Sequence, residues 1–62
     1  KSTMDCLKIK TSSNESFYLQ YRTWNKGMNG YYPYVKSTEN DYAGSSGKPI
    51  QQLQILDLPY SL

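Results

Sequence analysis

An alternation of side chains between residues 17 and 24 constrains the fold of this chain more than any other feature. Phe17, Leu19 and Tyr21 occupy odd positions, and the residues between them form a second, more polar set. A period of two is typical of a β-strand that presents one face to a core. The even set ends at Trp24, so we expect this side chain on the opposite face, at a surface or an interface.

The remaining segments also favour strands. We predict further strands over 4–11, 31–36 and 50–58, and a long polar loop over 37–48. Pro33 cannot donate a ladder hydrogen bond, so the strand that contains it should lie at a sheet edge or carry a bulge. No segment has a helical period, and three prolines and four glycines interrupt the chain. The sequence therefore predicts an all-β fold, a small antiparallel sheet or sandwich of four to six short strands.

The length allows one small domain, residues 1–62. Such a chain buries only about 60% of the surface that its unfolded form exposes, and domains of this size usually add a disulfide, a metal or a partner subunit. Cys6 is the only cysteine and histidine is absent, which excludes an internal disulfide and a histidine-based or multi-cysteine metal site. Association with another chain remains. Since Lys1 is not methionine, we expect the domain to be part of a longer chain.

Residues 4–9 and 50–55 share one pattern, with apolar residues at the first, fourth and sixth places. Two unrelated amphipathic strands would also give this echo. If the echo is real, the chain begins on the closing strand of one repeat unit and then runs through a whole second unit. The offset of 46 residues, from 4 to 50, fits a small all-β repeat.

The sequence offers little for catalysis. Glu39 and Asp41 lie near each other, but on a polar loop with little to desolvate them. A glycosidase instead fixes two carboxylates a few ångströms apart and raises the pKa of one of them. Without histidine there is no base for a catalytic triad. The glycines and lysine at 44–48 lack the spacing of a phosphate loop and precede a strand. We expect no catalytic residue, no metal and no cofactor in these 62 residues, and no enzyme activity.

The aromatic residues give the positive signal for function. Seven tyrosines and one tryptophan occur in a chain whose net charge is only +2. Their flat faces suit sugar rings, whose hydroxyls need polar neighbours. The predicted ligand-binding residues offer such faces or hydrogen bonds: Arg22, Trp24, Tyr31, Tyr32, Tyr34, Asp41 and Tyr42. The plainer interpretation is that about half of these rings pack in the core or across strands. By alternation, we expect Tyr31 and Val35 inside, and Tyr32 and Tyr34 more exposed.

The segment from Tyr21 to Ile55 resembles the clostridial hydrophobic W repeat, and more closely the related C-terminal modules of clostridial and phage muramidases and endolysins. The resemblance rests on the aromatic strand, the Gly-Tyr-Tyr-Pro-Tyr-Val step at 30–35, the Asp-Tyr-Ala-Gly turn at 41–44 and the apolar closing strand. There are two departures. Tyr31 stands where the family usually has its tryptophan, and Trp24 stands where the family often has a histidine.

The resemblance implies a non-catalytic cell-wall-binding domain, the C-terminal part of a phage endolysin. Its partners would be a glycan or secondary polymer of a clostridial-type wall and an upstream muramidase or amidase domain, and we expect a homodimer. Such lysins are made in the host cytoplasm without a signal peptide and act at the bacterial wall. We expect no membrane partner, because no apolar run is long enough to span a bilayer.

Two alternatives belong to other functional classes. One is a structural module whose apolar and tyrosine faces meet copies of itself. The other is a small β domain that stacks single-stranded nucleic acid on its rings. The weak charge and the absence of an RRM-like pattern speak against the second, so we expect no nucleic acid partner.

Overall fold

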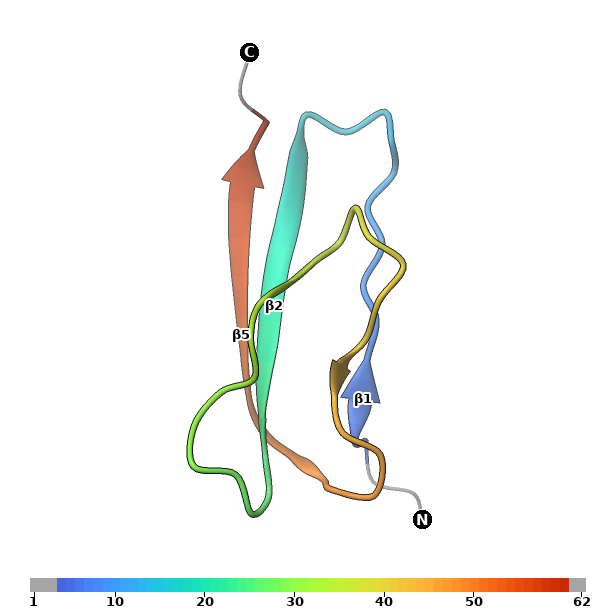
Figure 1. Cartoon of the computed structure of the whole chain (residues 1–62). Helices are drawn as coiled ribbons and strands as arrows, with labels where there is room; N and C mark the ends of the chain where they lie inside the picture. The colour runs from blue at the N-terminus through green and yellow to red at the C-terminus, as the bar shows by residue number, and fades with distance from the viewer. Residues whose placement is uncertain (1–3, 61–62) are drawn as a thin grey trace.

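The computed structural model of the protein describes residues 4–60, a range that contains strands and no helix. Its five strands are β1 (Cys6–Leu7), β2 (Phe17–Asn25), β3 (Val35–Lys36), β4 (Ala43–Gly44) and β5 (Ile50–Pro59). They form two small antiparallel sheets, one of order β3-β2-β5 and one that pairs β1 with β4. Figure 1 shows β2 between β5 on one side and the β1–β4 pair on the other. The all-β prediction is confirmed.

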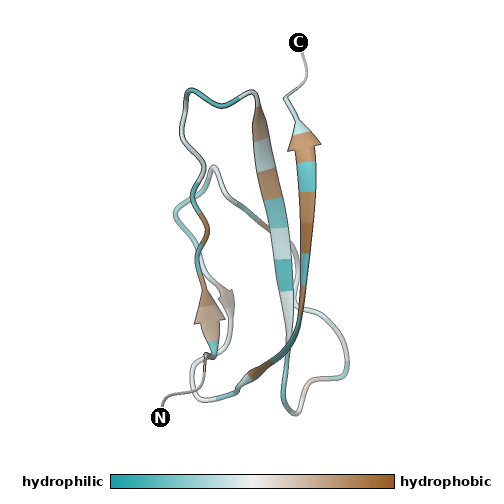
Figure 2. Ribbon diagram, turned by 180° about the vertical axis from the view of Figure 1, so that it is seen from behind, coloured by the Kyte–Doolittle hydropathy of each residue, from teal (hydrophilic) through white to brown (hydrophobic). Residues whose placement is uncertain are grey.

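Strand β2 organises the molecule and follows the predicted alternation. Tyr21, Thr23 and Asn25 are buried, whereas the even residues are half-buried on the opposite face. We call the Tyr21 side the inner face and the Arg22 side the outer face. Figure 2 shows polar and apolar residues alternating along β2 and forming polar and apolar bands along β5. The β2–β5 register places Ile55 opposite Tyr21 on the inner face.

The core is small and centres on one ring. Tyr21, Val35 and Ala43 form the buried cluster, and Leu7 and Ile9 pack against it. The Tyr21 hydroxyl accepts a hydrogen bond from the Ile9 N–H at 3.0 Å and lies 3.2 Å from the Asp41 carbonyl oxygen. A buried tyrosine usually finds a partner for its hydroxyl. Here that partner joins the N-terminal segment to the central strand.

Buried Asn25 ties the end of β2 to two other segments. Its side-chain Nδ2 donates to the carbonyl oxygens of Asp5 at 2.9 Å and Lys48 at 2.6 Å, and its Oδ1 accepts from the Thr23 hydroxyl at 2.7 Å. Both the nitrogen and the oxygen of this buried amide therefore have hydrogen-bond partners, as is usual for buried polar groups. Just beyond it, the Met28 N–H donates to the Asn25 carbonyl at 3.0 Å and closes a turn in which Gly27 has φ of 86°.

Three predicted segments differ from the structure. Of the strand predicted over 4–11, only Cys6–Leu7 is a strand, and of 31–36 only Val35–Lys36. The second of these lies at the sheet edge, as Pro33 predicted, because proline interrupts the ladder just before it. The predicted loop over 37–48 contains β4, which the two-residue Ala-Gly sequence does not announce.

Gly44 explains why β4 has this sequence. Its φ is +120°, and a Cβ at this position would lie 2.2 Å from the Asp5 backbone carbonyl oxygen. Only glycine avoids both the backbone strain and the clash. The neighbouring Ala43 is 1% exposed and fills the space beside Tyr21 and Val35. The Ala-Gly pair thus lets β4 approach β1 closely while it completes the core.

Candidate ligand-binding surface

The outer face of β2 carries a stacked group of aromatic rings around one arginine. The Arg22 Cζ lies 4.3 Å from the ring centroid of Tyr31 and 4.5 Å from that of Tyr34. Both contacts fall within the range of cation–π attraction. The guanidinium therefore contacts two rings that come from a segment without regular structure, and it positions both on the sheet.

Trp24 extends the same group. Its ring meets Tyr31 edge-on, with centroids 5.5 Å apart and an interplanar angle of 75°, the T-shaped arrangement that aromatic pairs favour. The Trp24 Nε1 donates to the Met28 carbonyl oxygen at 3.1 Å, which also holds the turn after β2. We call these four side chains the arginine stack: Arg22, Trp24, Tyr31 and Tyr34.

Two glutamines of β5 support the arginine stack from the adjacent strand. Gln54 Oε1 accepts from Arg22 Nε at 2.7 Å and lies 3.4 Å from the Tyr34 hydroxyl, which donates to it. Gln52 Oε1 lies 2.9 Å from the Tyr31 hydroxyl, which donates to it. Neither glutamine was among the predicted site residues. The even positions of β5 were the available signal, but their proximity to Arg22 follows only from the β2–β5 register.

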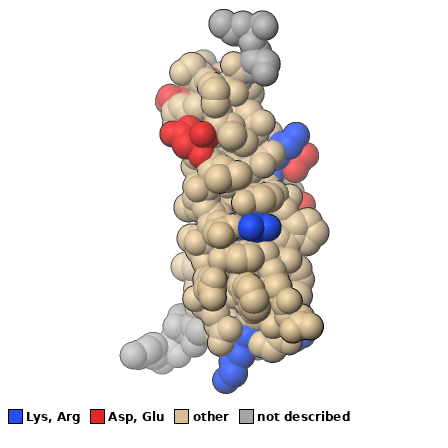
Figure 3. Space-filling model, turned by 90° about the vertical axis from the view of Figure 1, so that its left-hand side faces the viewer, with Lys and Arg blue, Asp and Glu red and all other residues tan. Residues whose placement is uncertain are grey.

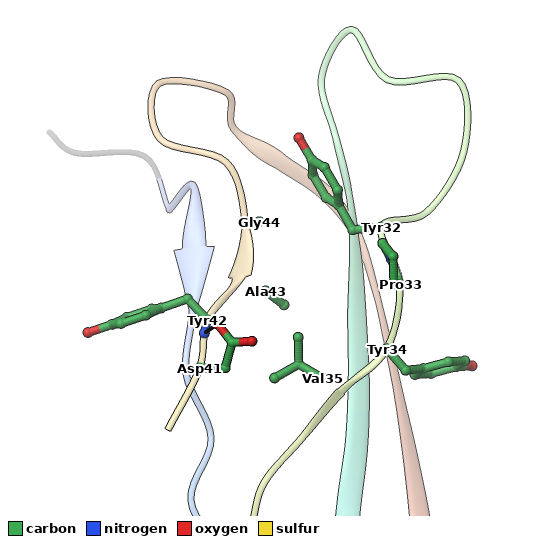
Figure 4. A pocket seen from close by; sticks show the side chains of 8 residues that line it. All are labelled: Tyr32, Pro33, Tyr34, Val35, Asp41, Tyr42, Ala43 and Gly44. Atoms are coloured by element: carbon green, nitrogen blue, oxygen red, sulfur yellow. Dashed lines mark hydrogen bonds between the residues drawn. The ribbon is translucent and has the colours of Figure 1, made fainter. Parts of the chain in front are cut away.

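A shallow depression lies between the 32–35 segment and β4. Its volume is about 240 Å³. Four predicted site residues line it together with Val35 and Ala43: Tyr32, Tyr34, Asp41 and Tyr42. Figure 4 shows Val35 and Ala43 pointing into the space, whereas the rings of Tyr34 and Tyr42 project away from it on opposite sides. The depression thus has an apolar floor and a rim of tyrosines.

The rim residues differ in how they are held. Tyr42 is 59% exposed, and the Lys8 Nζ lies 4.8 Å from its ring centroid. Lys8 also donates to the Asn40 side chain. The exposed Asp41 accepts a hydrogen bond from the Tyr42 N–H at 2.8 Å through Oδ1, so this carboxylate shapes the turn that presents the ring. Lys8 was not among the predicted site residues, since it lies 34 positions before Tyr42.

The seven predicted residues therefore fall into two adjoining groups that share Tyr34. Tyr34 is 37% exposed, and Trp24 and Tyr32 are half-buried. Burial of Val35 and exposure of Tyr34 were predicted correctly. The placement of Tyr31 inside was wrong, because its ring packs on Trp24 and Arg22 of the outer face. Strand alternation does not hold there, since regular pairing begins only at Val35.

The neighbouring residues Asp5 and Cys6 both have shifted pKa values. The Gly47 N–H donates to Asp5 Oδ2 at 2.8 Å and holds the pKa of this carboxyl below its ordinary value of 3.8. Burial, and then the charge of Asp5, raises the pKa of the Cys6 thiol above its usual 9.0. The thiol is protonated at neutral pH and is a poor nucleophile.

Comparison of the sequence and structure with protein-family models, curated proteins and solved structures gives no match. Within residues 4–60, no three His, Cys, Asp or Glu side chains are grouped so that they would hold a metal ion. The same part of the chain has no helix long and apolar enough to cross a membrane.

Proposed function

We propose that this protein is a non-catalytic cell-wall-binding module that recognises a surface glycan or secondary polymer of a clostridial-type bacterial wall. The observation that carries the proposal is the joining of the arginine stack to the depression through Tyr34. A sugar ring needs an exposed aromatic face with hydrogen-bonding groups beside it. Tyr34 offers such a face at the point where both groups meet.

The residues of this surface have different roles in the proposed recognition. Tyr34 and Tyr42 provide exposed ring surface, and Asp41 lines the depression. Arg22 contacts the ring of Tyr34 directly and that of Tyr31 beside it, and Trp24 packs on Tyr31. Because the ring of Tyr34 is already packed on Arg22 before a ligand arrives, binding to it would cost little side-chain entropy.

In a phage endolysin such a module would act by tethering. Binding to the wall raises the local concentration of an attached hydrolase without any chemistry in the module itself. The partner within the chain would be an upstream muramidase or amidase domain, as the resemblance of residues 21–55 to clostridial lysin modules implies. The protein would then be phage-encoded, made in the host cytoplasm and active at the wall.

A co-sedimentation assay with purified clostridial-type cell walls tests this function. We expect the wild-type chain to sediment with the walls, and Tyr34→Ala and Tyr42→Ala each to weaken retention. Tyr60→Ala is the matched control. Tyr60 is exposed to a similar extent, 41%, but its ring packs on Tyr18, away from both groups. Retention of the wild type in the supernatant, or an equal loss for the Tyr60 variant, would overturn the proposal. Pre-treating the walls to remove secondary polymers would separate those polymers from peptidoglycan as the ligand.

A specific observation also favours a second role, association with copies of the same unit. Strand β5 lies at the edge of its sheet and exposes Leu53 and Ile55 on the inner face, by 46% and 48%. Contiguous apolar side chains on an open edge typically mark an interaction surface. An association module and a wall-binding module are compatible, because the arginine stack lies on the outer face.

A further inference from the structure

Two exposed residues of β5 have partly buried counterparts 46 positions earlier in the chain. Leu53 and Ile55 lie on the inner face and are 46% and 48% exposed. In the echo between residues 4–9 and 50–55, these two positions correspond to Leu7 and Ile9. The earlier pair packs against the Tyr21, Val35 and Ala43 core. Identical residues are thus partly buried against the core in the first segment and exposed in the second.

The backbone of the first segment meets the core through its odd residues. Leu7 pairs with Ala43 of β4, and the Ser45 N–H donates to the Asp5 carbonyl oxygen at 3.1 Å. The Ile9 N–H donates to the Tyr21 hydroxyl at 3.0 Å. The Thr11 N–H donates to the Ser37 carbonyl oxygen at 3.3 Å. Every second residue from 5 to 11 therefore turns its backbone groups toward the core.

The odd residues of β5 turn their backbone N–H and C=O groups to the open edge of the sheet. On β2, the carbonyl oxygens of Leu19 and Thr23 accept from Ser37 and Tyr32, so the odd residues of β2 face the β3 side. Its even residues must then pair with β5, where their register partners are also even. The backbone groups of three odd β5 residues consequently point to the open edge: Leu53, Ile55 and Asp57.

We propose that β5 docks on the core of a second copy of this unit, in the way that residues 4–11 dock on their own core. Leu53 and Ile55 would take the places of Leu7 and Ile9. The Ile55 N–H would donate to the Tyr21 hydroxyl of the second copy, and the Asp57 N–H to its Ser37 carbonyl oxygen. Strand β5 then serves two cores at once, because its even residues pair with β2 and its odd residues with the next unit.

The surface around β5 fits such a partner. Figure 3 views the side of the molecule on which β5 lies in Figure 1, and most of this face is uncharged. The contact is head to tail, since β5 of one unit meets the inner face of the next, and such contacts stack units in a row. In the receiving unit, β5 of the first unit takes the place of residues 4–11 on the core. This inference does not depend on wall binding.

A tandem chain tests the proposal directly. In this chain, residues 1–56 are joined directly to residues 11–62. Residues 50–56 of the first unit therefore occupy the positions that residues 4–10 would occupy just before the second unit. The second unit has no other segment to complete its core. We expect both units to fold, and the amide of Ile55 in the first unit to exchange with deuterium roughly tenfold or more slowly than the same amide in the second unit, whose edge is open. A second unit that stays unfolded, or equal exchange of the two amides, overturns the proposal.

The tandem chain also contains its own matched control. Ile55→Asp in the first unit should unfold the second unit, whereas the same substitution in the second unit lies on the open edge and should leave both units folded. Tyr21→Phe in the second unit should return the exchange of the first Ile55 amide to the open-edge rate. Equal effects of Ile55→Asp at both positions would contradict the shared strand.

Discussion

The guanidinium of Arg22 and the side-chain amide of Gln54 lie opposite each other across the β2–β5 pair, with Nε and Oε1 2.7 Å apart. This hydrogen bond fixes the guanidinium where it contacts Tyr31 and Tyr34. Lysine has no planar fork and would not reproduce both the stacking and the bond. The position of the two rings therefore depends on arginine at this site.

Replacing Arg22 by methionine should destabilise the protein and loosen the rings. Methionine keeps much of the apolar stem but loses two cation–π contacts, each worth about 0.5–1 kcal/mol at a partly exposed site. We expect a loss of about 1–2 kcal/mol in urea unfolding and weaker wall retention. Arg22→Lys should lie between the wild type and Arg22→Met. A methionine variant with unchanged stability would show that the stack contributes nothing to the fold.

Tyr21→Phe should weaken the link between β2 and the N-terminal segment. The substitution keeps the ring in the core but leaves the partly buried Ile9 N–H without its partner at 3.0 Å. An unsatisfied buried donor costs about 1–3 kcal/mol. Urea unfolding measures this loss, and Tyr42→Phe is the control because that ring is 59% exposed. Equal midpoints for the two variants would argue against the role of the hydroxyl.

Much of the fold could be predicted from local patterns. The alternation from Phe17 to Trp24 gave the two faces of β2, and Pro33 correctly indicated an edge for β3. Strand β4 could not be found in this way. It consists of two small residues whose role depends on the close approach of the Asp5 backbone, and a contact between distant segments leaves no periodic signal.

The candidate site was predictable as a set of residue types but not as an arrangement. The excess of tyrosine identified the rings, yet alternation placed Tyr31 inside, because it assumed a strand where the chain is irregular. Gln52 and Gln54 join the site only through pairing with a strand about 30 residues earlier. Sequence alone does not specify that register.

Two glycine substitutions should separate a steric clash from backbone strain. Gly44 and Gly47 both have positive φ, +120° and +85°. Alanine at 44 would place its Cβ 2.2 Å from the Asp5 carbonyl oxygen, whereas nothing lies within 4 Å of a Cβ at 47. Both variants pay the strain, which exceeds about 1 kcal/mol where alanine must adopt positive φ. We expect Gly44→Ala to be clearly the less stable in thermal unfolding; equal losses would mean that β1 and β4 separate freely.

The carboxyl of Asp5 should make stability depend on pH in the acid range. The Gly47 N–H lowers its folded-state pKa below the ordinary 3.8, so the unfolded chain takes up a proton first as the pH falls. The stabilisation is therefore present above the ordinary pKa of 3.8 and is lost as the pH falls through the folded-state pKa. Asp5→Asn retains an oxygen acceptor for Gly47 but does not titrate. Urea midpoints at pH 7 and pH 3 should thus differ more for the wild type than for Asp5→Asn, and parallel changes in the two proteins would exclude Asp5 as the source of the acid sensitivity.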